Sequence, residues 1–337
     1  MYGYWTEIDI KATLPEINVD RPTVLSIGNL NLDIYMKIGG LPGIDEAVDA
    51  FEAYVGGGGS AANFSVQVAK LGLGSRFIGS VGTDTVGDIL VDELRNLGID
   101  TRFIKRIAYE KTGTVTVLVG LDGSKRMIAY RGANMGLIPS DLDGAAIEGI
   151  SHIHLATGRT EIIEAGFRKG RSMGATVSID GGTNLARKGI DVVAALIRGI
   201  DVMFMNSVEA KILSGVEDPI KAGFSIYSKV EPRELIITLG PKGALCISGN
   251  GSKVVESFRV TPIDTTGAGD VFAASYISAR LMGLDIVERL IFANASASIS
   301  VTRRGARSGP RLDEVLEFLS SIGYKEIVEK LANENKV

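Results

Sequence analysis

The segment DTTGAGD, residues 264–270, places two glycines and two acidic residues directly before the apolar stretch VFAASYISARL. The first turn of a helix exposes backbone N–H groups and the positive end of the helix dipole, so it attracts anions such as phosphate. Gly267, Ala268 and Gly269 leave these amides uncovered by large side chains. Asp270 would repel a bound phosphate, unless its carboxylate faces a substrate hydroxyl whose proton must leave. The segment is therefore typical of a phosphoryl-transfer site, with Asp270 as a simple helix cap as the alternative.

The composition narrows the class of protein. The chain has 337 residues, is 45% hydrophobic and carries a net charge of −4 without a basic block, so we expect small ligands and no nucleic-acid partner. The single cysteine, Cys246, excludes an intramolecular disulfide and fits a reducing compartment, and its apolar neighbours predict a buried thiol. We find neither a signal peptide nor an apolar run of about 20 residues, and therefore expect a cytoplasmic protein with no membrane partner.

Short β-branched runs recur along the chain, and each precedes an amphipathic segment. The predicted strands cover 23–29, 76–81, 152–156, 175–179, 202–206 and 234–240. The predicted helices cover 60–72, 85–97, 160–173, 190–199, 207–214, 270–283, 285–301 and 311–320, and Ser140 and Asp141 indicate a further helix start. This rhythm predicts a largely parallel sheet with helices on both faces. His152 and His154 alternate on one strand without a nearby acid and are expected in the core or at an edge of the sheet, not as a catalytic base.

Two stretches break this rhythm. Residues 36–55 and 101–131 alternate in polarity without a helix between them, which predicts antiparallel hairpins. Together they would form a small sheet, either a lid over a ligand or an edge extension. We therefore divide the chain into an N-terminal extension over 1–22, a tail or an arm packed on a partner, one α/β domain over 23–325, and a helix end or tail over 326–337.

Other polar residues could bind an acceptor. Asn31 and Asp33 stand two apart at the end of the first predicted strand, so their side chains point the same way, as a polyol requires. An Asx turn is the alternative explanation. Arg131, after the second hairpin, could meet an anionic acceptor or a phosphate, or could be solvated.

Several motifs resemble one family. DTTGAGDVFAASYISA resembles the C-terminal signature of the ribokinase-like (PfkB) carbohydrate kinases, and GGGGSAANFSVQVAKLG, residues 56–72, resembles their N-terminal signature. The similarity extends in the family's order to NSVE, TLGPKGA and SISVTRRGARSGP, and spans about residues 23–320. It implies a three-layer α/β/α sandwich with a mostly parallel central sheet and a small β-sheet lid. It also implies transfer of a nucleotide's γ-phosphoryl group to an alcohol of a sugar or nucleoside.

The resemblance assigns roles to the residues of the later motifs. Asp270 matches the family's catalytic base, and residues 267–269 match its anion hole. Asn206 and Glu209 match a pair that organises Mg²⁺ and its waters, and residues three apart at a strand-to-helix corner do share one face. A capping box, in which Asn206 is the N-cap, is a compatible alternative.

The resemblance also assigns binding residues. Thr238, Gly240 and Gly243 match the turn that binds nucleotide phosphate and ribose, with a plain tight turn as the alternative. Gly59 and Asn63 match residues that complete the sugar pocket beside Asn31 and Asp33.

Three further expectations follow from the resemblance. Many members bind a monovalent cation near the C-terminal signature, and Asp264 with the Arg307–Ser308 loop occupies the matching region, so K⁺ is a possible cofactor beside ATP and Mg²⁺. Several relatives are homodimers that pair through the lid. Nothing in the sequence separates ATP from ADP as the donor.

The acceptor is less well defined. Ser60 replaces the lysine usual in ribokinases, and LATGR, residues 155–159, lacks their ribose-contacting glutamate, which puts ribose itself in doubt. We expect an unphosphorylated sugar or sugar acid. A nucleoside is the alternative, with an aromatic shelf for its base supplied by the small sheet's aromatic side chains. The candidates are Phe51, Tyr54, Phe103 and Tyr130. A catalytically silent sugar-binding module is an alternative of another class.

Overall fold

Runs of valine, isoleucine and leucine form the main sheet of the computed structural model, which describes residues 21–334. Within that range the sheet has eight strands in the order β14-β13-β12-β11-β10-β9-β1-β4, and only β13 and β14 run antiparallel to their neighbours. The strands are β1 (Thr23–Gly28), β4 (Gly74–Ile78), β9 (Ile150–Ala156), β10 (Thr176–Ile179), β11 (Val202–Asn206), β12 (Glu234–Thr238), β13 (Ala244–Ser248) and β14 (Gly251–Val255). The predicted parallel sheet is confirmed. The extension predicted over 1–22 lies almost wholly outside the described residues.

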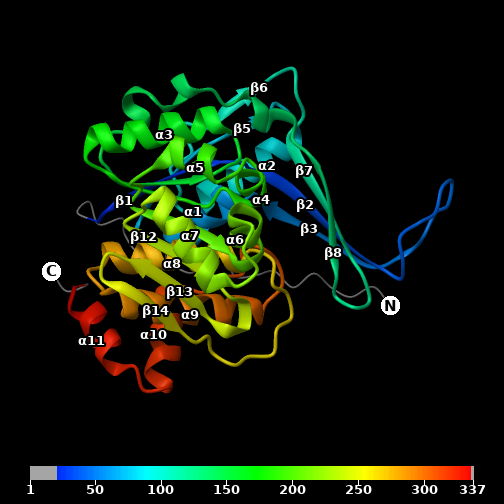
Figure 1. The fold of residues 1–337 in the computed structure, drawn as a ribbon. Coiled ribbons are helices and arrows are strands. Elements are labelled where there is room, and N and C mark those ends of the chain that lie inside the picture. Colours follow the sequence, from blue (N-terminus) through cyan, green and yellow to red (C-terminus); the bar gives the residue numbers. More distant parts are fainter. Residues whose placement is uncertain (1–20, 335–337) are drawn as a thin grey trace.

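Helices cover both faces of the sheet (Figure 1). One face packs against α1 (Ser60–Lys70), α8 (Ala268–Leu281) and α9 (Ile286–Val301). The other packs against α3 (Thr160–Met173), α5 (Ile190–Ile197), α6 (Ser207–Ser214) and α7 (Pro219–Val230). Both faces need a cover because successive side chains of a strand point to opposite faces. On β11, Val202 and Phe204 face the first layer of helices, while Met203 and Met205 face the second. The predicted three-layer α/β/α sandwich is therefore confirmed.

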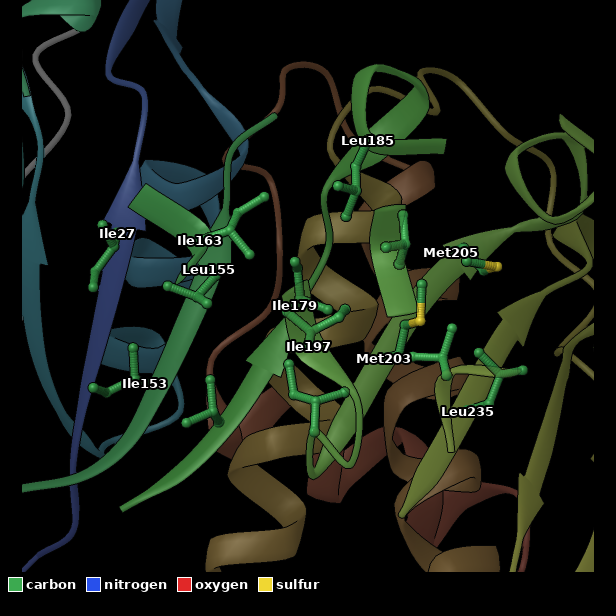
Figure 2. Packing of buried hydrophobic residues seen from close by; sticks show 14 of the residues in the cluster. Ile27, Ile153, Leu155, Ile163, Ile179, Leu185, Ile197, Met203, Met205 and Leu235 are labelled. Atoms are coloured by element: carbon green, nitrogen blue, oxygen red, sulfur yellow. The ribbon is translucent and has the colours of Figure 1, made fainter. Parts of the chain in front are cut away.

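The core on the α3 and α5 face is built from aliphatic side chains of successive strands (Figure 2). Ile27 of β1, Leu155 of β9 and Ile179 of β10 are all fully buried there. On the opposite face His154 is buried and stacks on Phe64 with ring centroids 3.7 Å apart, so the predicted core position of the histidines is confirmed. Burial lowers the pKa of His154 to about 3, which keeps the ring neutral at physiological pH.

A second sheet of four strands, called the small sheet below, lies to one side of the sandwich (Figure 1). It contains β2 (Asn31–Ile38), β3 (Ala50–Gly58), β7 (Gly113–Val119) and β8 (Lys125–Tyr130), in the order β3-β2-β7-β8. The hairpin predicted over 36–55 is longer in the structure. The prediction for 101–131 is wrong over its first part, because Lys105–Ile107 forms β6, which pairs with β5 (Ser80–Gly82) in a separate sheet.

Other differences have local causes. The strand predicted over 76–81 breaks at Gly79, where a Cβ atom would lie 2.6 Å from the carbonyl oxygen of Gly28. The helix start predicted at Ser140 gives only the 3₁₀ turn Pro139–Leu142, because Gly144 then turns the chain with φ 62°. The sequence does not predict α4 (Gly182–Ala186) or α7. It predicts α11 (Lys325–Glu334) only as a helix end or tail.

The remaining helices complete the described chain. Two of them, α2 (Thr85–Asn96) and α10 (Leu312–Ser321), were predicted within a residue or two. In residues 21–334 we find no helix with the length and apolar character needed to span a bilayer.

The start of α8 depends on a glycine. Gly267 has φ 76°, and a Cβ atom there would lie 2.2 Å from the carbonyl oxygen of Ala306. The loop after α9 therefore packs directly on the backbone that opens α8. A side chain at this position would have to push the two segments apart.

We predict that Gly267→Ala lowers the free energy of unfolding by about 1–3 kcal/mol, because alanine is strained at this φ and collides with Ala306. Gly269→Ala is the matched control, since a Cβ atom at Gly269 meets nothing within 4 Å. Urea titrations of both variants provide the measurement. Equal unfolding midpoints for the two variants would contradict the role given to Gly267.

Candidate active site

A cavity of about 470 Å³ opens at the carboxyl edge of the main sheet. Five adjacent strands each contribute a residue at or just after their ends: β1, β9, β10, β11 and β12. These residues are Asn29, Ala156, Asp180, Asn206 and Thr238. The carboxyl ends of parallel strands are the usual binding edge of such sheets. The sheet therefore supplies the floor of the cavity.

The small sheet supplies a wall of the same cavity. Asn31 and Asp33 of β2, Val115 of β7 and Met127 of β8 face into it, and Arg131 lies at its rim. The placement of Asn31 and Asp33 at the end of the first strand is wrong, because β1 ends at Gly28 and the two residues open β2. Their predicted common direction is confirmed, since residues two apart on any strand face the same side.

The starts of two helices close the cavity. Gly267, Gly269 and Asp270 come from the start of α8, and Gly59 and Asn63 come from the start of α1. Asp270 is not the cap of α8, because the N-cap is Gly267 and no side chain caps this helix. The capping alternative is thus wrong for Asp270, and its carboxylate faces the cavity.

The amides at the start of α8 are partly available. The Ala268 N–H donates to the Thr265 carbonyl oxygen at 3.3 Å, and the Val271 N–H donates to the Gly267 carbonyl oxygen at 2.9 Å. The amides of Gly269 and Asp270 lie between these two in the first turn, where a helix offers no internal acceptor. Ala268 itself is not among the residues that line the cavity. An anion in the cavity would meet the exposed amides of the first turn.

The Asp270 carboxylate has a perturbed pKa. Its Oδ2 accepts a hydrogen bond from Asn63 Nδ2 at 2.8 Å. Burial raises the pKa of Asp270 to about 7, against the lowering effect of hydrogen bonds from Asn63 and Ser60. A carboxyl group with this pKa can exchange a proton near neutral pH, which suits a general base.

Asp33 presents an unsatisfied oxygen. Its side chain is buried, its Oδ2 accepts a hydrogen bond from Tyr35 OH at 3.3 Å, and its Oδ1 has no hydrogen-bond partner among residues 21–334. Burial raises the pKa of Asp33 to about 6. Because a buried oxygen without a donor is unfavourable, a ligand hydroxyl in the cavity would satisfy it.

Asn206 and Glu209 form a capping box at the start of α6. Asn206 Oδ1 accepts from the Glu209 N–H at 2.9 Å, and Glu209 Oε2 accepts from the Asn206 N–H at 3.0 Å. The capping alternative is confirmed, and both residues also line the cavity. No cluster of three or more His, Cys, Asp or Glu side chains suited to a metal occurs among residues 21–334. A metal ion here would need further oxygen ligands, such as water or phosphate.

Asp180 was missed by the sequence interpretation. It follows β10 and lines the cavity between the residues contributed by β9 and β11. Burial, together with the nearby charges of Glu209 and Asp270, raises the pKa of Asp180 to about 8. The signal that could have identified it is its position directly after a predicted parallel strand, at the edge of the sheet where ligands usually bind.

Only part of the predicted nucleotide turn reaches the cavity. Thr238 lines it, whereas Gly240 and Gly243 are not among its lining residues. The two glycines form the turn from β12 to β13, and a Cβ atom at Gly243 would lie 1.9 Å from the carbonyl oxygen of Val255. The tight-turn alternative therefore accounts for both glycines in the structure.

Asp264 lies at a second cavity of about 350 Å³, between the small sheet and the segment before α8. Its Oδ1 accepts from Lys125 Nζ at 2.9 Å and from Thr266 Oγ1 at 2.7 Å, and its Oδ2 accepts from Tyr54 OH at 2.9 Å. Burial would raise its pKa, but the hydrogen bonds from Thr266 and Lys125 hold that pKa well below its ordinary value. The carboxylate already binds one ammonium group, and the K⁺ site stays a prediction.

The aromatic side chains proposed for a nucleoside base lie elsewhere. Phe51 and Tyr130 are 68% and 51% exposed, Tyr54 donates to Asp264, and Phe103 lies under Arg76. None of the four is among the residues that line the first cavity.

Comparisons with known proteins agree with this geometry. A family model described as pfkB family carbohydrate kinase matches residues 21–313. An ATP-dependent ribose-1-phosphate kinase of Halopiger xanaduensis is 33% identical over 297 residues, covering 88% of this chain and 98% of that protein.

Two solved structures share the fold. Arabidopsis thaliana ribokinase, in complex with ribose and ATP, has a TM-score of 0.77 at 26% identity and covers 89% of this chain and 99% of its own. An E. coli protein in complex with ATP and Mg²⁺ has a TM-score of 0.77 at 27% identity, with the same coverage of both chains. The chain belongs to the PfkB family of carbohydrate kinases and is a phosphotransferase that acts on alcohol groups.

Proposed function

We propose that this chain transfers the γ-phosphoryl group of ATP to a hydroxyl of a small sugar. The observation that carries the proposal is the juxtaposition of Asp270, at the open start of α8, with the unsatisfied carboxylate oxygen of Asp33 in one cavity. The Asp270 carboxylate suits proton removal, and the Asp33 carboxylate suits the binding of a hydroxyl. The silent sugar-binding module is disfavoured, because the chain belongs to a family of phosphotransferases.

In the proposed reaction, the Asp33 carboxylate accepts hydrogen bonds from hydroxyls of the acceptor, and the Asn31 NH₂ group donates to a hydroxyl oxygen. Asp270 takes the proton of the attacking hydroxyl while the hydroxyl oxygen forms a bond to the γ-phosphorus. The bond from that phosphorus to the β–γ bridging oxygen breaks, and ADP leaves with that oxygen. Of the predicted anion hole, the amides of Gly269 and Asp270 would face the transferred group and stabilise its negative charge, whereas the Ala268 N–H is already bonded to Thr265.

The proposed nucleotide site lies on the side of Thr238, Asn206 and Glu209. Glu209 and Asp180 place two acidic side chains in the same cavity, which favours a cation beside the phosphates. Asn206 and Glu209 would hold Mg²⁺ through its water molecules. When bound, the ion neutralises charge on the phosphoryl oxygens. The E. coli relative solved with ATP and Mg²⁺ supports this choice of donor and metal.

A phosphorylated pentose is the second candidate acceptor. Arg131 at the rim of the cavity can bind an anionic group, and the Halopiger relative is a ribose-1-phosphate kinase. The nucleoside alternative loses its structural support, because the aromatic side chains proposed as a shelf do not line the cavity.

We also propose a homodimer that pairs through the small sheet. On the face opposite Asp33, Val55, Ile34, Thr116 and Ile128 lie side by side across its four strands. Val55 and Ile128 are 65% and 67% exposed, an apolar row that a second copy would cover.

We predict that Asp270→Asn lowers kcat by about 10²–10⁴-fold, because the amide cannot accept the hydroxyl proton. The affinity for ATP, measured by calorimetry, should change little. In the wild-type enzyme kcat/KM should fall about tenfold per pH unit below pH 7, since the pKa of Asp270 is raised to about 7 and its protonated form is inactive. An unchanged kcat in Asp270→Asn would remove the assignment of Asp270 as the general base, whereas the absence of ADP release with every sugar tested in the wild type would remove the proposed function.

We predict that an ADP-release screen with ATP identifies a small sugar or sugar phosphate, and not a nucleoside, as the acceptor. If the acceptor is a sugar phosphate, Arg131→Met should raise its KM about 10–100-fold, the loss expected for a hydrogen bond to a charged group. Arg126→Met, on an exposed residue of β8 outside the cavity, is the matched control. Repeating the screen with ADP tests the donor, and a nucleoside as best acceptor would contradict the assignment.

We predict that light scattering gives a dimer for the wild type and a monomer for Ile128→Glu, because a buried charge would oppose pairing at the small sheet. Ile89→Glu alters an equally exposed isoleucine on α2 and should leave the dimer intact. A wild-type monomer would refute pairing through this face.

A further inference from the structure

Arg307 is an almost buried arginine next to the proposed base. Its side chain is only 9% exposed, and its Nη1 lies 2.6 Å from Glu93 Oε2 of α2. Its Nη2 donates to the Gly58 carbonyl oxygen at 3.2 Å, and its Nε donates to Asn63 Oδ1 at 3.3 Å. One guanidinium group therefore joins α2, the end of β3 and the start of α1.

Two features fix the position of Arg307. Lys70 Nζ of α1 donates to the Arg307 carbonyl oxygen at 2.7 Å and to the Gly309 carbonyl oxygen at 2.9 Å, so the loop is anchored to the helix that carries Asn63. A Cβ atom at Gly57 would lie 2.0 Å from Arg307 Nη1. The guanidinium thus fills the space where any other residue at position 57 would place its side chain.

The consequence concerns the Asn63 carboxamide. Its Oδ1 accepts from Arg307, and its Nδ2 donates to Asp270 Oδ2 at 2.8 Å. If the amide were rotated by half a turn, its oxygen would face the Asp270 carboxylate and its NH₂ group would face the guanidinium, and both contacts would be repulsive. Arg307 therefore selects the orientation that gives Asp270 a donor.

We propose that Arg307 is a positioning residue for the phosphoryl transfer: held by Glu93, it keeps the Asn63 NH₂ group directed at the Asp270 carboxylate. The inference rests on the proposed role of Asp270 as the general base. Arg307 acts through Asn63, and its guanidinium is not among the groups that line the cavity.

The charges that face Asp270 give this role a measurable signature. Asp33 of β2 raises the pKa of Asp270, whereas Arg307 lowers it. The negative charges of Asp270 and of Glu209 of α6 also raise the pKa of Asp180, which follows β10 and lines the same cavity. Removing Arg307 therefore takes away a positive charge that lowers the pKa of Asp270. It also frees the Asn63 carboxamide, which donates the hydrogen bond to Asp270.

The test compares kcat and the pH dependence of kcat/KM in four enzymes: wild type, Arg307→Met, Arg307→Lys and Arg303→Met. For Arg307→Met we expect kcat to fall about 10–100-fold, as for a slight misplacement of catalytic groups, and the acidic limb of the profile to move to higher pH. Arg303→Met removes another arginine ion pair, with Glu314, away from the cavity and should match the wild type. A profile and kcat for Arg307→Met equal to those of Arg303→Met would overturn the proposal.

Arg307→Lys keeps the buried charge beside Glu93. This variant tests the positioning role if Arg307→Met does not fold. Lysine lacks the fork that reaches Gly58 and Asn63 together, so we expect kcat to stay lowered while the acidic limb returns toward the wild-type position. A wild-type kcat in Arg307→Lys would overturn the proposal. Failure of the base assignment appears separately, as an unchanged kcat in Asp270→Asn.

Discussion

Four carboxyl groups share one cavity, and their burial away from water is the constraint on which the site depends. Asp33, Asp180, Glu209 and Asp270 all line it. Burial raises the pKa of Asp33 to about 6, of Asp270 to about 7 and of Asp180 to about 8, so all three depart from ordinary aspartates in the same direction. Such a cluster is stable when donors and cations surround it. The helix-start amides, a guanidinium and a bound metal–nucleotide are groups of this kind.

The glycine run 56–59 shows how closely the fold packs these groups. A Cβ atom at Gly57 would meet Arg307, one at Gly58 would lie 2.1 Å from the Asp33 carboxyl group, and one at Gly59 would lie 2.3 Å from the Asn29 carbonyl oxygen. The backbone at the end of β3 thus passes where side chains would otherwise stand. The motif that identifies the family in the sequence is therefore a steric requirement of the acceptor wall and of the group that positions Asn63.

Sequence reasoning succeeded where the signal is local. Asn206 and Thr238 follow from short motifs that resemble the family's, and Asp270 follows from the glycines at a helix start. Contacts between distant segments left no such signal, and the pairing of Lys125 with Asp264 joins residues 139 positions apart. Helix α7 was missed because Gly223 weakens its propensity, although a Cβ atom there would lie 2.8 Å from Ile247, so that glycine lets the helix approach the sheet.

The contacts at Asp264 connect the small sheet, which binds the acceptor in the proposed reaction, with the segment that leads to the proposed base, Asp270. Tyr54 and Lys125 belong to the small sheet, and both donate to a carboxylate whose own chain leads, six residues later, to Asp270. Tyr35, which stacks on Tyr54 at 4.4 Å, donates to Asp33. A displacement of the small sheet would therefore change the separation of Asp33 from Asp270. Since near-attack geometry depends on that separation, the ion pair at Asp264 limits how far acceptor and base can drift apart.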